Sequence, residues 1–254
     1  MDLFIDDATP SHVLFPPGRS TGLDLTGRPE GFAYAGTADP YPDELLIPRS
    51  EWQERIKERE TLKITNRDHA KRVGLPCKDQ ASANYCWINA PVYAVEMQRA
   101  IEGQPTVILS PASAGAQIKN YRNVGGWGKE GLEWIAKNGV APVSLWPANA
   151  IDRRYATEAA RTAALKYRVH EWWELQPRNI DHLVSCMLRG WCVAVGYNWW
   201  GHEVTAVDAL WLDNTIALLI RNSWGSAWGD EGYGILQGSR MLPDDAVSPR
   251  LMAA

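Results

Sequence analysis

The sequence has few cysteines, and their spacing favours no structural role for them. The four are Cys77, Cys86, Cys186 and Cys192. They are too scattered for the disulfide framework of a small secreted domain, and no Cys-x-x-Cys pair indicates zinc. The five histidines show no ligand spacing either, so we expect no metal and no cofactor. A reducing compartment is the simplest setting, although a Cys186–Cys192 bridge is left open.

Long apolar runs and an excess of basic charge are also missing. No window approaches the roughly 18 apolar residues that span a bilayer. The N-terminus begins Met-Asp-Leu-Phe-Ile-Asp-Asp, without the positive region of a signal peptide. The formal net charge is −4, so neither nucleic acid nor an anionic membrane is expected as a partner. We therefore expect a cytoplasmic protein, with a virion as the alternative setting.

The composition that is present is typical of a globular domain. Apolar residues make up 45% of the chain and charged residues 22%, and tryptophan is unusually frequent at 13. Residues 1–45 differ from the rest because they are rich in Pro, Gly, Asp and Thr. We expect an irregular N-terminal arm there, packed on the domain or on a protein partner, and a folded domain over 46–254.

Hydrophobic periodicity predicts helices in the first part of that domain and strands in the second. The expected helices cover 50–60, with Ser50 as N-cap, 85–101, with Asn84 as N-cap, 129–138 and 179–189. Pro91 predicts a kink or a later start in the second of these. The expected strands cover 191–197, 203–211, 215–221 and 233–237. This order favours an α+β fold with a helical half and a sheet half.

Cys86 stands at the predicted start of a buried helix. Helix N-termini and a neighbouring imidazolium both lower the pKa of a thiol. Acyl transfer by cysteine also requires a base within hydrogen-bond reach. Taken alone, Cys86 is more simply interpreted as an inert buried cysteine.

Three segments together change that interpretation. They read Gln80-Ala-Ser-Ala-Asn-Tyr-Cys86-Trp87, Gly201-His202-Glu-Val, and Asn222-Ser-Trp-Gly followed by Trp-Gly and Gly-Tyr. In this order and spacing the chain resembles the papain-like cysteine peptidases of C1 type. It looks like a minimal, disulfide-poor, bacterial or phage-like member. The resemblance covers about residues 45–240, and Asn-Ser-Trp-Gly is its most specific part.

The resemblance implies a two-lobed fold with the active-site cleft between the lobes. The helical lobe would cover about 75–165, and an antiparallel sheet or barrel lobe about 166–254 plus the N-terminal segment. Cys86 would be the nucleophile and His202 the base. Asn222 would orient the imidazole, and Gln80 would complete the oxyanion hole.

Five further residues are implied at the substrate. Gly125 and Gly126 would let a substrate backbone approach closely because they lack Cβ. Trp224 would cover the His–Asn contact. Asn84 would crowd the cleft beside the nucleophile, and Trp200 would form a cleft wall. A tandem pair, Trp172-Trp173, is instead expected in the core.

The sequence departs from the family in several places. Ala83 and Asn123 stand where the resemblance would place a disulfide, so that bridge is absent. The loop before His202 is reduced to 198–201, which reshapes the cleft. The arm over 1–45 is too short and irregular for a helical inhibitory propeptide, so ordinary zymogen control is not expected.

Two functions of different classes follow. The first is a cysteine peptidase that hydrolyses peptide bonds of a polypeptide substrate, which predicts an accessible thiolate at Cys86. The second is a papain-fold structural or assembly component, for example of a phage, with weak or no activity. Burial of Cys86 under the arm or a partner favours the second.

Overall fold

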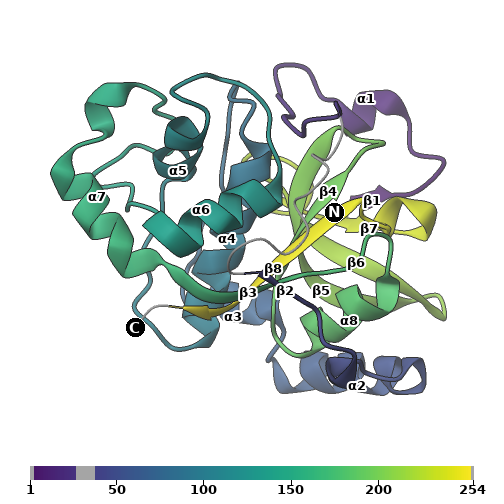
Figure 1. The fold of residues 1–254 in the computed structure, drawn as a ribbon. Coiled ribbons are helices and arrows are strands. Elements are labelled where there is room, and N and C mark those ends of the chain that lie inside the picture. The colour runs from purple at the N-terminus through teal and green to yellow at the C-terminus, as the bar shows by residue number, and fades with distance from the viewer. Residues whose placement is uncertain (1–2, 27–37, 253–254) are drawn as a thin grey trace.

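The computed structural model describes residues 3–26 and 38–252, so residues 27–37 of the expected arm lie outside the described residues. Helices and strands are arranged in two lobes (Figure 1). The helical lobe contains α4 (Cys86–Ile101), α5 (Pro111–Ile118), α6 (Gly128–Asn138) and α7 (Glu158–Ala164). Four more helices lie on the arm or around the sheet: α1 (Ser11–Leu14), α2 (Arg49–Leu62), α3 (Asn66–Arg72) and α8 (Ile180–Leu188).

The second lobe is built on one mixed sheet. Its strand order within the described residues is β1-β7-β6-β5-β4-β8-β3-β2. The strands are β1 (Phe4–Ile5), β2 (Ala38–Pro40), β3 (Val169–Glu174), β4 (Val193–Tyr197), β5 (His202–Leu212), β6 (Thr215–Arg221), β7 (Tyr233–Leu236) and β8 (Asp245–Met252). The inner pairings are antiparallel, but the edge pairs β1–β7 and β2–β3 are parallel. The expected antiparallel sheet is present in the inner strands, and segments of the arm add one parallel strand at each edge.

Each lobe has its own apolar core, and β3 serves both. Trp172 packs in the core of the helical lobe, whereas Trp173 packs in the core of the sheet lobe. Successive residues of a strand point to opposite faces, so the tandem tryptophans bind the lobes together. Both are buried, as the sequence predicted.

Helix α4 runs through the interior and carries Cys86 at its first position. Every residue over 86–99 is buried, and the helix packs on β5 and β8. It continues unbroken through Pro91, so the predicted kink or later start is wrong. Proline leaves the Trp87 carbonyl without its helical donor, and this carbonyl lies against Gly131 of α6, whose missing side chain gives it room.

The expected helices and strands begin and end within about two residues of the observed ones, but both expected N-caps are wrong. Pro48 occupies the N-cap of α2 instead of Ser50, and Tyr85 that of α4 instead of Asn84. Helices α3 and α5 were not predicted, although each has a start signal. Thr65 and Asp68 form a capping box, and Pro111 follows an N-cap serine.

Candidate active site

His202 and Asn222 are brought together by neighbouring strands of the sheet. His202 begins β5, and Asn222 directly follows β6. The imidazole Nε2 lies 2.8 Å from the Asn222 Oδ1. Because an amide oxygen only accepts, Nε2 carries the proton and Nδ1 is the free acceptor. The Trp224 ring stacks on the imidazole, with 4.5 Å between ring centroids, and shields this contact.

Cys86 lies at the same place, fully buried at the lobe junction. The backbone N–H of Glu203, the residue after His202, donates to its sulfur. Burial raises the pKa of the Cys86 thiol far above its usual range, and the Glu203 carboxyl raises it further. Burial also lowers the pKa of His202 to about 4. The structure therefore holds a neutral thiol and a neutral imidazole instead of an ion pair.

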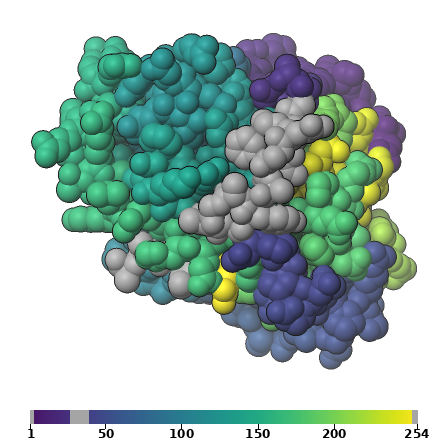
Figure 2. All heavy atoms as spheres, in the orientation of Figure 1, coloured from purple at the N-terminus to yellow at the C-terminus, as the bar shows by residue number. Residues whose placement is uncertain are grey.

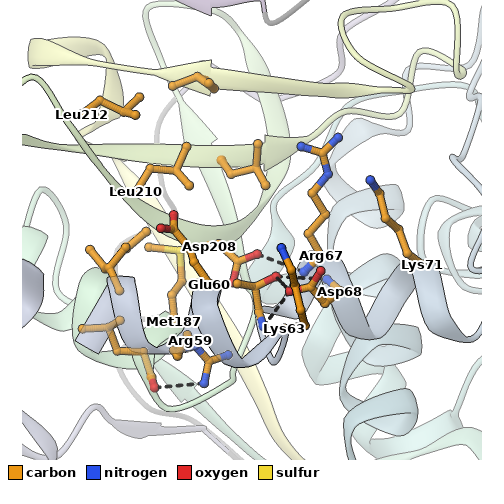
Figure 3. Close-up of a pocket in the computed structure, with 16 residues that line it drawn as sticks. Arg59, Glu60, Lys63, Arg67, Asp68, Lys71, Met187, Asp208, Leu210 and Leu212 are labelled. Carbon is orange, nitrogen blue, oxygen red and sulfur yellow. Dashed lines mark hydrogen bonds between the residues drawn. The ribbon is translucent and has the colours of Figure 1, made fainter. Parts of the chain in front are cut away.

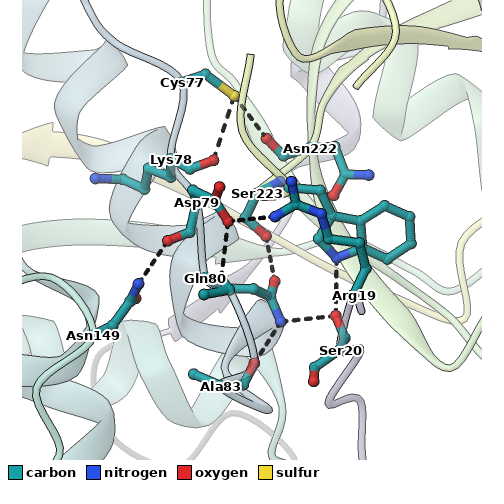
Figure 4. A network of polar contacts seen from close by, with 12 residues as sticks. Arg19, Ser20, Cys77, Lys78, Asp79, Gln80, Ala83, Asn149, Asn222 and Ser223 are labelled. Carbon is teal, nitrogen blue, oxygen red and sulfur yellow. Dashed lines mark hydrogen bonds and ion pairs between the residues drawn. The ribbon is translucent and has the colours of Figure 1, made fainter. Parts of the chain in front are cut away.

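Gln80 is held by its neighbours with the amide nitrogen toward the N-terminal arm (Figure 4). The Ser223 hydroxyl donates to its Oε1 at 2.5 Å, and the other end of the amide must be the nitrogen because it faces backbone carbonyls, which only accept. Its Nε2 then donates to the carbonyls of Ser20 and Thr21, each at 3.0 Å, and to that of Ala83 at 2.7 Å. The donor assigned to the oxyanion hole is thus occupied by the chain's own backbone.

Residues 20–24, called the strap below, cross the site as an extended segment. The Gly126 N–H donates to the Gly22 carbonyl at 3.0 Å, and the Asp24 N–H donates to the Gly126 carbonyl at 3.1 Å. This is a parallel bridge between Leu23 and Gly126. On the other side, the Leu23 N–H donates to the Gly201 carbonyl at 3.1 Å. The strap is therefore paired with both lobes.

The strap settles where this part of the arm packs, which the sequence left open between the domain and a partner. Backbone hydrogen bonds hold the strap over the candidate site. The space-filling view shows the purple N-terminal residues at the junction of the teal helical lobe and the green sheet lobe (Figure 2). The arm also continues the sheet at β1, so it packs on its own domain.

The predicted glycine turn lies under the strap. A Cβ on Gly125 would lie 2.7 Å from the Gly22 carbonyl oxygen, and one on Gly126 would lie 2.6 Å from the Trp87 ring. Side chains at these positions would exclude an extended backbone. Asn84 ties this turn to the loop before α4, because its backbone N–H donates to the Asn123 Oδ1 at 2.7 Å. A polar contact thus joins the loops that lack the family disulfide.

Trp200 does not form an open cleft wall, and this prediction is wrong. Its side chain is 1% exposed and packs edge-on against His202, with 5.0 Å between ring centroids. Its Nε1–H donates to the Leu14 carbonyl at 2.8 Å. It is a core residue that also anchors the arm, because the short loop over 198–201 turns it inward.

A separate pocket of about 390 Å³ lies between α2, α3 and the strands β5 and β6 (Figure 3). Arg59, Arg67 and Asp208 are among its lining, but none of the predicted site residues is. One of its charged residues, Arg67, forms an ion pair with Asp230. No cluster of side chains suited to a metal ion occurs in the described part of the chain. Nor do the described residues include a helix with the length and apolar character needed to cross a membrane.

Comparison with known proteins agrees with the fold. No protein-family model matches the chain. Cathepsin L 2 of Paramecium tetraurelia is 29% identical over 192 residues, covering 66% of this chain and 57% of the relative. Caricain of Carica papaya is 25% identical over 248 residues, covering 89% and 70%. The relatives of this chain are papain-like cysteine peptidases.

Solved structures show the same papain-like fold. Xylellain, a cysteine protease from Xylella fastidiosa, superimposes with a TM-score of 0.58 at 23% identity, covering 70% of this chain and 83% of that one. The digestive procathepsin L 3 of Tenebrio molitor superimposes with a TM-score of 0.60 at 20% identity, covering 69% and 66%. The chain spans somewhat over half the length of the cathepsin L relative it matches.

The candidate site contains residues that the sequence motifs did not single out. Ser223 orients Gln80, Glu203 contacts Cys86, and the strap occupies the site. Ser223 could have been found from its place between two predicted site residues. The strap could not, because its contacts are made by the backbone, and any sequence has a backbone.

Proposed function

We propose that this chain is a cysteine peptidase that hydrolyses peptide bonds and that its own strap holds it in a latent form. The single observation that carries this is the buried His202–Asn222 pair at 2.8 Å beside Cys86 at the start of a helix. The folded unit over 46–254 would be the catalytic domain, and the arm over 1–45 its internal inhibitor. The four free thiols support a reducing, intracellular setting in a bacterium or phage.

The chemistry begins when the strap leaves and water reaches the site. His202 Nδ1 then takes the Cys86 proton, because solvation favours the thiolate and imidazolium over the buried neutral pair. The thiolate attacks the substrate carbonyl carbon and a C–S bond forms. Gln80 Nε2–H and the Cys86 backbone N–H donate to the oxyanion.

The second half of the cycle returns the proton. The imidazolium donates to the leaving amine nitrogen as the C–N bond breaks, which leaves a thioester on Cys86. Water then attacks the thioester with His202 as the base, releasing the acid and restoring the thiol. Asn222 keeps the ring oriented throughout by accepting from Nε2–H.

A Gly22→Val substitution tests this proposal. A Cβ on Gly22 would lie 2.3 Å from the Asn84 carbonyl oxygen, so valine must displace the strap without changing a catalytic group. We expect Cys86 alkylation by iodoacetamide to rise at least about tenfold, to persist below pH 7, and to be accompanied by hydrolysis of casein. Alkylation is followed at Cys86 by peptide mass spectrometry.

Two controls make the result specific. Gly18→Asn keeps a residue suited to a positive φ at a position with open space around it, so the strap should stay closed. Cys86→Ala in the Gly22→Val chain should abolish hydrolysis. An opened strap with rapid Cys86 labelling but no hydrolysis of any peptide pool would contradict the peptidase proposal.

The second candidate function is a papain-fold assembly component. It is supported by the complete burial of Cys86 and by the number of backbone contacts that hold the arm on its own domain. On this alternative the strap is a permanent part of the fold. Gly22→Val would then unfold the chain or leave Cys86 unreactive, in place of opening a competent site.

A further inference from the structure

Three neighbouring strands of the sheet form a row of acid, glycine and acid beside the nucleophile. Glu203 of β5 is directly paired with Gly196 of β4, and Gly196 is directly paired with Asp245 of β8. Directly paired residues project from the same face of a sheet. The two carboxyl side chains therefore flank a position that has no side chain.

The side chain of Leu23 from the strap fills that gap. A Cβ on Gly196 would lie 3.2 Å from Leu23 Cδ1, 3.5 Å from its Cδ2 and 3.4 Å from the Asp245 Cβ. Leu23 is 7% exposed there. We call the Glu203–Gly196–Asp245 row the acidic slot. A segment that pairs with Gly126 as the strap does would place one side chain in the acidic slot.

Leucine is chemically mismatched to this slot. The Gly128 N–H donates to the Glu203 Oε2 at 2.9 Å, but the Glu203 Oε1 has no hydrogen-bond partner among the described residues. Glu203 is 0% exposed, and a buried carboxyl oxygen without a donor costs free energy. Burial, and next the Asp245 carboxyl, raise the pKa of Glu203 well above its usual range. With Leu23 in place, Glu203 is held in its neutral form.

A cationic side chain would relieve the mismatch. It would give the free Glu203 oxygen a donor and would favour ionisation of carboxyls that repel each other. The slot is also close to the reacting sulfur, because the Glu203 backbone N–H donates to Cys86. A side chain in the slot is therefore held next to the bond that Cys86 would attack.

We propose that the acidic slot is a specificity pocket that takes a lysine or arginine side chain of the polypeptide substrate once the strap has left. The role in substrate choice rests on the proposed peptidase function, but the ligand chemistry of the slot does not. In the latent form Leu23 occupies the slot as a weak, uncharged stand-in that a basic side chain displaces.

The slot chemistry is tested in the intact chain, without catalysis, by replacing Leu23. Leu23→Lys places an ammonium group between the carboxyls, and Leu23→Met is the control of similar length without charge. We expect the lysine variant to slow Cys86 alkylation about tenfold relative to the methionine variant and to raise the melting temperature. Glu203→Gln should remove most of this difference, because one of the two charges is lost.

The opposite result would overturn the proposal. If Leu23→Lys labels as fast as Leu23→Glu, or melts below Leu23→Met, the slot rejects cations and is apolar in character. An equal gain for lysine with and without Glu203→Gln would place the ammonium group elsewhere.

Substrate choice is tested separately in the Gly22→Val chain. Peptides that differ only by lysine, arginine, norleucine or leucine at one position are compared by kcat/KM, and by Kd in the Cys86→Ala background. We expect the basic peptides to exceed norleucine about tenfold in both readouts, with the difference mainly in KM. Asp244→Asn, a neighbouring surface change, should keep that ratio. Binding without hydrolysis would defeat the peptidase proposal alone, whereas a preference for norleucine would defeat the slot.

Discussion

At the scale of single residues, burial decides the protonation of the site. His202 and Cys86 are both fully buried, and both pKa values move in the direction that favours the neutral form. Solvent would lower the free-energy cost of the ionised pair relative to the buried one. The strap therefore does more than block access, because it removes the solvent that a thiolate and an imidazolium require.

The His202 shift makes stability depend on pH in a definite direction. The folded pKa of about 4 lies below the ordinary 6.5, so only the unfolded chain gains this proton between these values. The stabilisation is complete above pH 6.5 and is lost as the pH falls toward 4, by about 3 kcal/mol. Glu203 acts oppositely, because its raised pKa gives stabilisation that is lost as the pH rises above 4.5.

Urea unfolding at pH 4.5, 5.5 and 7 separates these effects. Between pH 7 and 4.5, the free energy of unfolding of the wild type should fall by about 2 kcal/mol more than that of His202→Ala. His170→Ala is the matched control, because His170 is an exposed residue of β3. Equal slopes for the wild type and His202→Ala would contradict the assignment of this pH dependence to His202.

Trp224 links the histidine to the strap, since its ring covers His202 and its Nε1–H donates to the Ser20 carbonyl at 2.9 Å. Trp224→Phe keeps most of the stacking but removes that donor. We expect Cys86 alkylation to become about fivefold faster, the effect of losing about 1 kcal/mol from the closed form. Trp228→Phe is the control, because the Trp228 Nε1–H has no hydrogen-bond partner among the described residues. Equal rates in the two variants would show that the Ser20 contact does not hold the strap.

At the scale of elements, helix ends show how tertiary packing changes the cost of one substitution. Gly103 after α4 and Gly139 after α6 both have a φ of +72°. Nothing lies near a Cβ added at Gly103, whereas one at Gly139 would lie 1.8 Å from the Ala164 carbonyl oxygen. The same φ therefore occurs in open space at one helix end and in an enclosed position at the other.

Alanine substitutions at these two positions should lower the free energy of unfolding by different amounts. Gly103→Ala should lower the free energy of unfolding by about 1 kcal/mol, the cost of the left-handed conformation alone. Gly139→Ala should cost at least about 2 kcal/mol more, because α6 and α7 must move apart. Denaturant titration measures both. Similar losses would mean that the contact with Ala164 relaxes easily.

At the scale of the whole molecule, the arm adds strands to the sheet and occupies the candidate site. Its first residues form β1 at one sheet edge, the strap pairs with both lobes, and β2 is added at the other edge. The strap, a segment of the chain itself, is thus the occupant of the site in this structure. The peptidase and assembly proposals differ in whether that occupant leaves, and the Gly22→Val experiment decides between them.

The sequence by itself determined the fold class, and its motifs included His202 and Asn222, which the structure brings into contact. Hydrophobic periodicity located α4, α6, α8 and the strands β4 to β7, because buried and exposed positions differ in residue type. The motif order implied that Cys86, His202 and Asn222 act together, and the structure pairs His202 with Asn222. Their catalytic role is still a proposal.

The tertiary structure alone decided what occupies and surrounds that site. The strap is held by backbone hydrogen bonds, which leave no pattern in the sequence. The acidic slot depends on register, because Glu203, Gly196 and Asp245 are adjacent only after three strands pair. The inward orientation of Trp200 was not predicted for a related reason, because the length of a loop does not reveal which way its side chains face. Contacts between residues far apart in the chain therefore decide which groups of the site are buried or hydrogen-bonded. The residue types at the site, by contrast, can be recognised from the sequence alone.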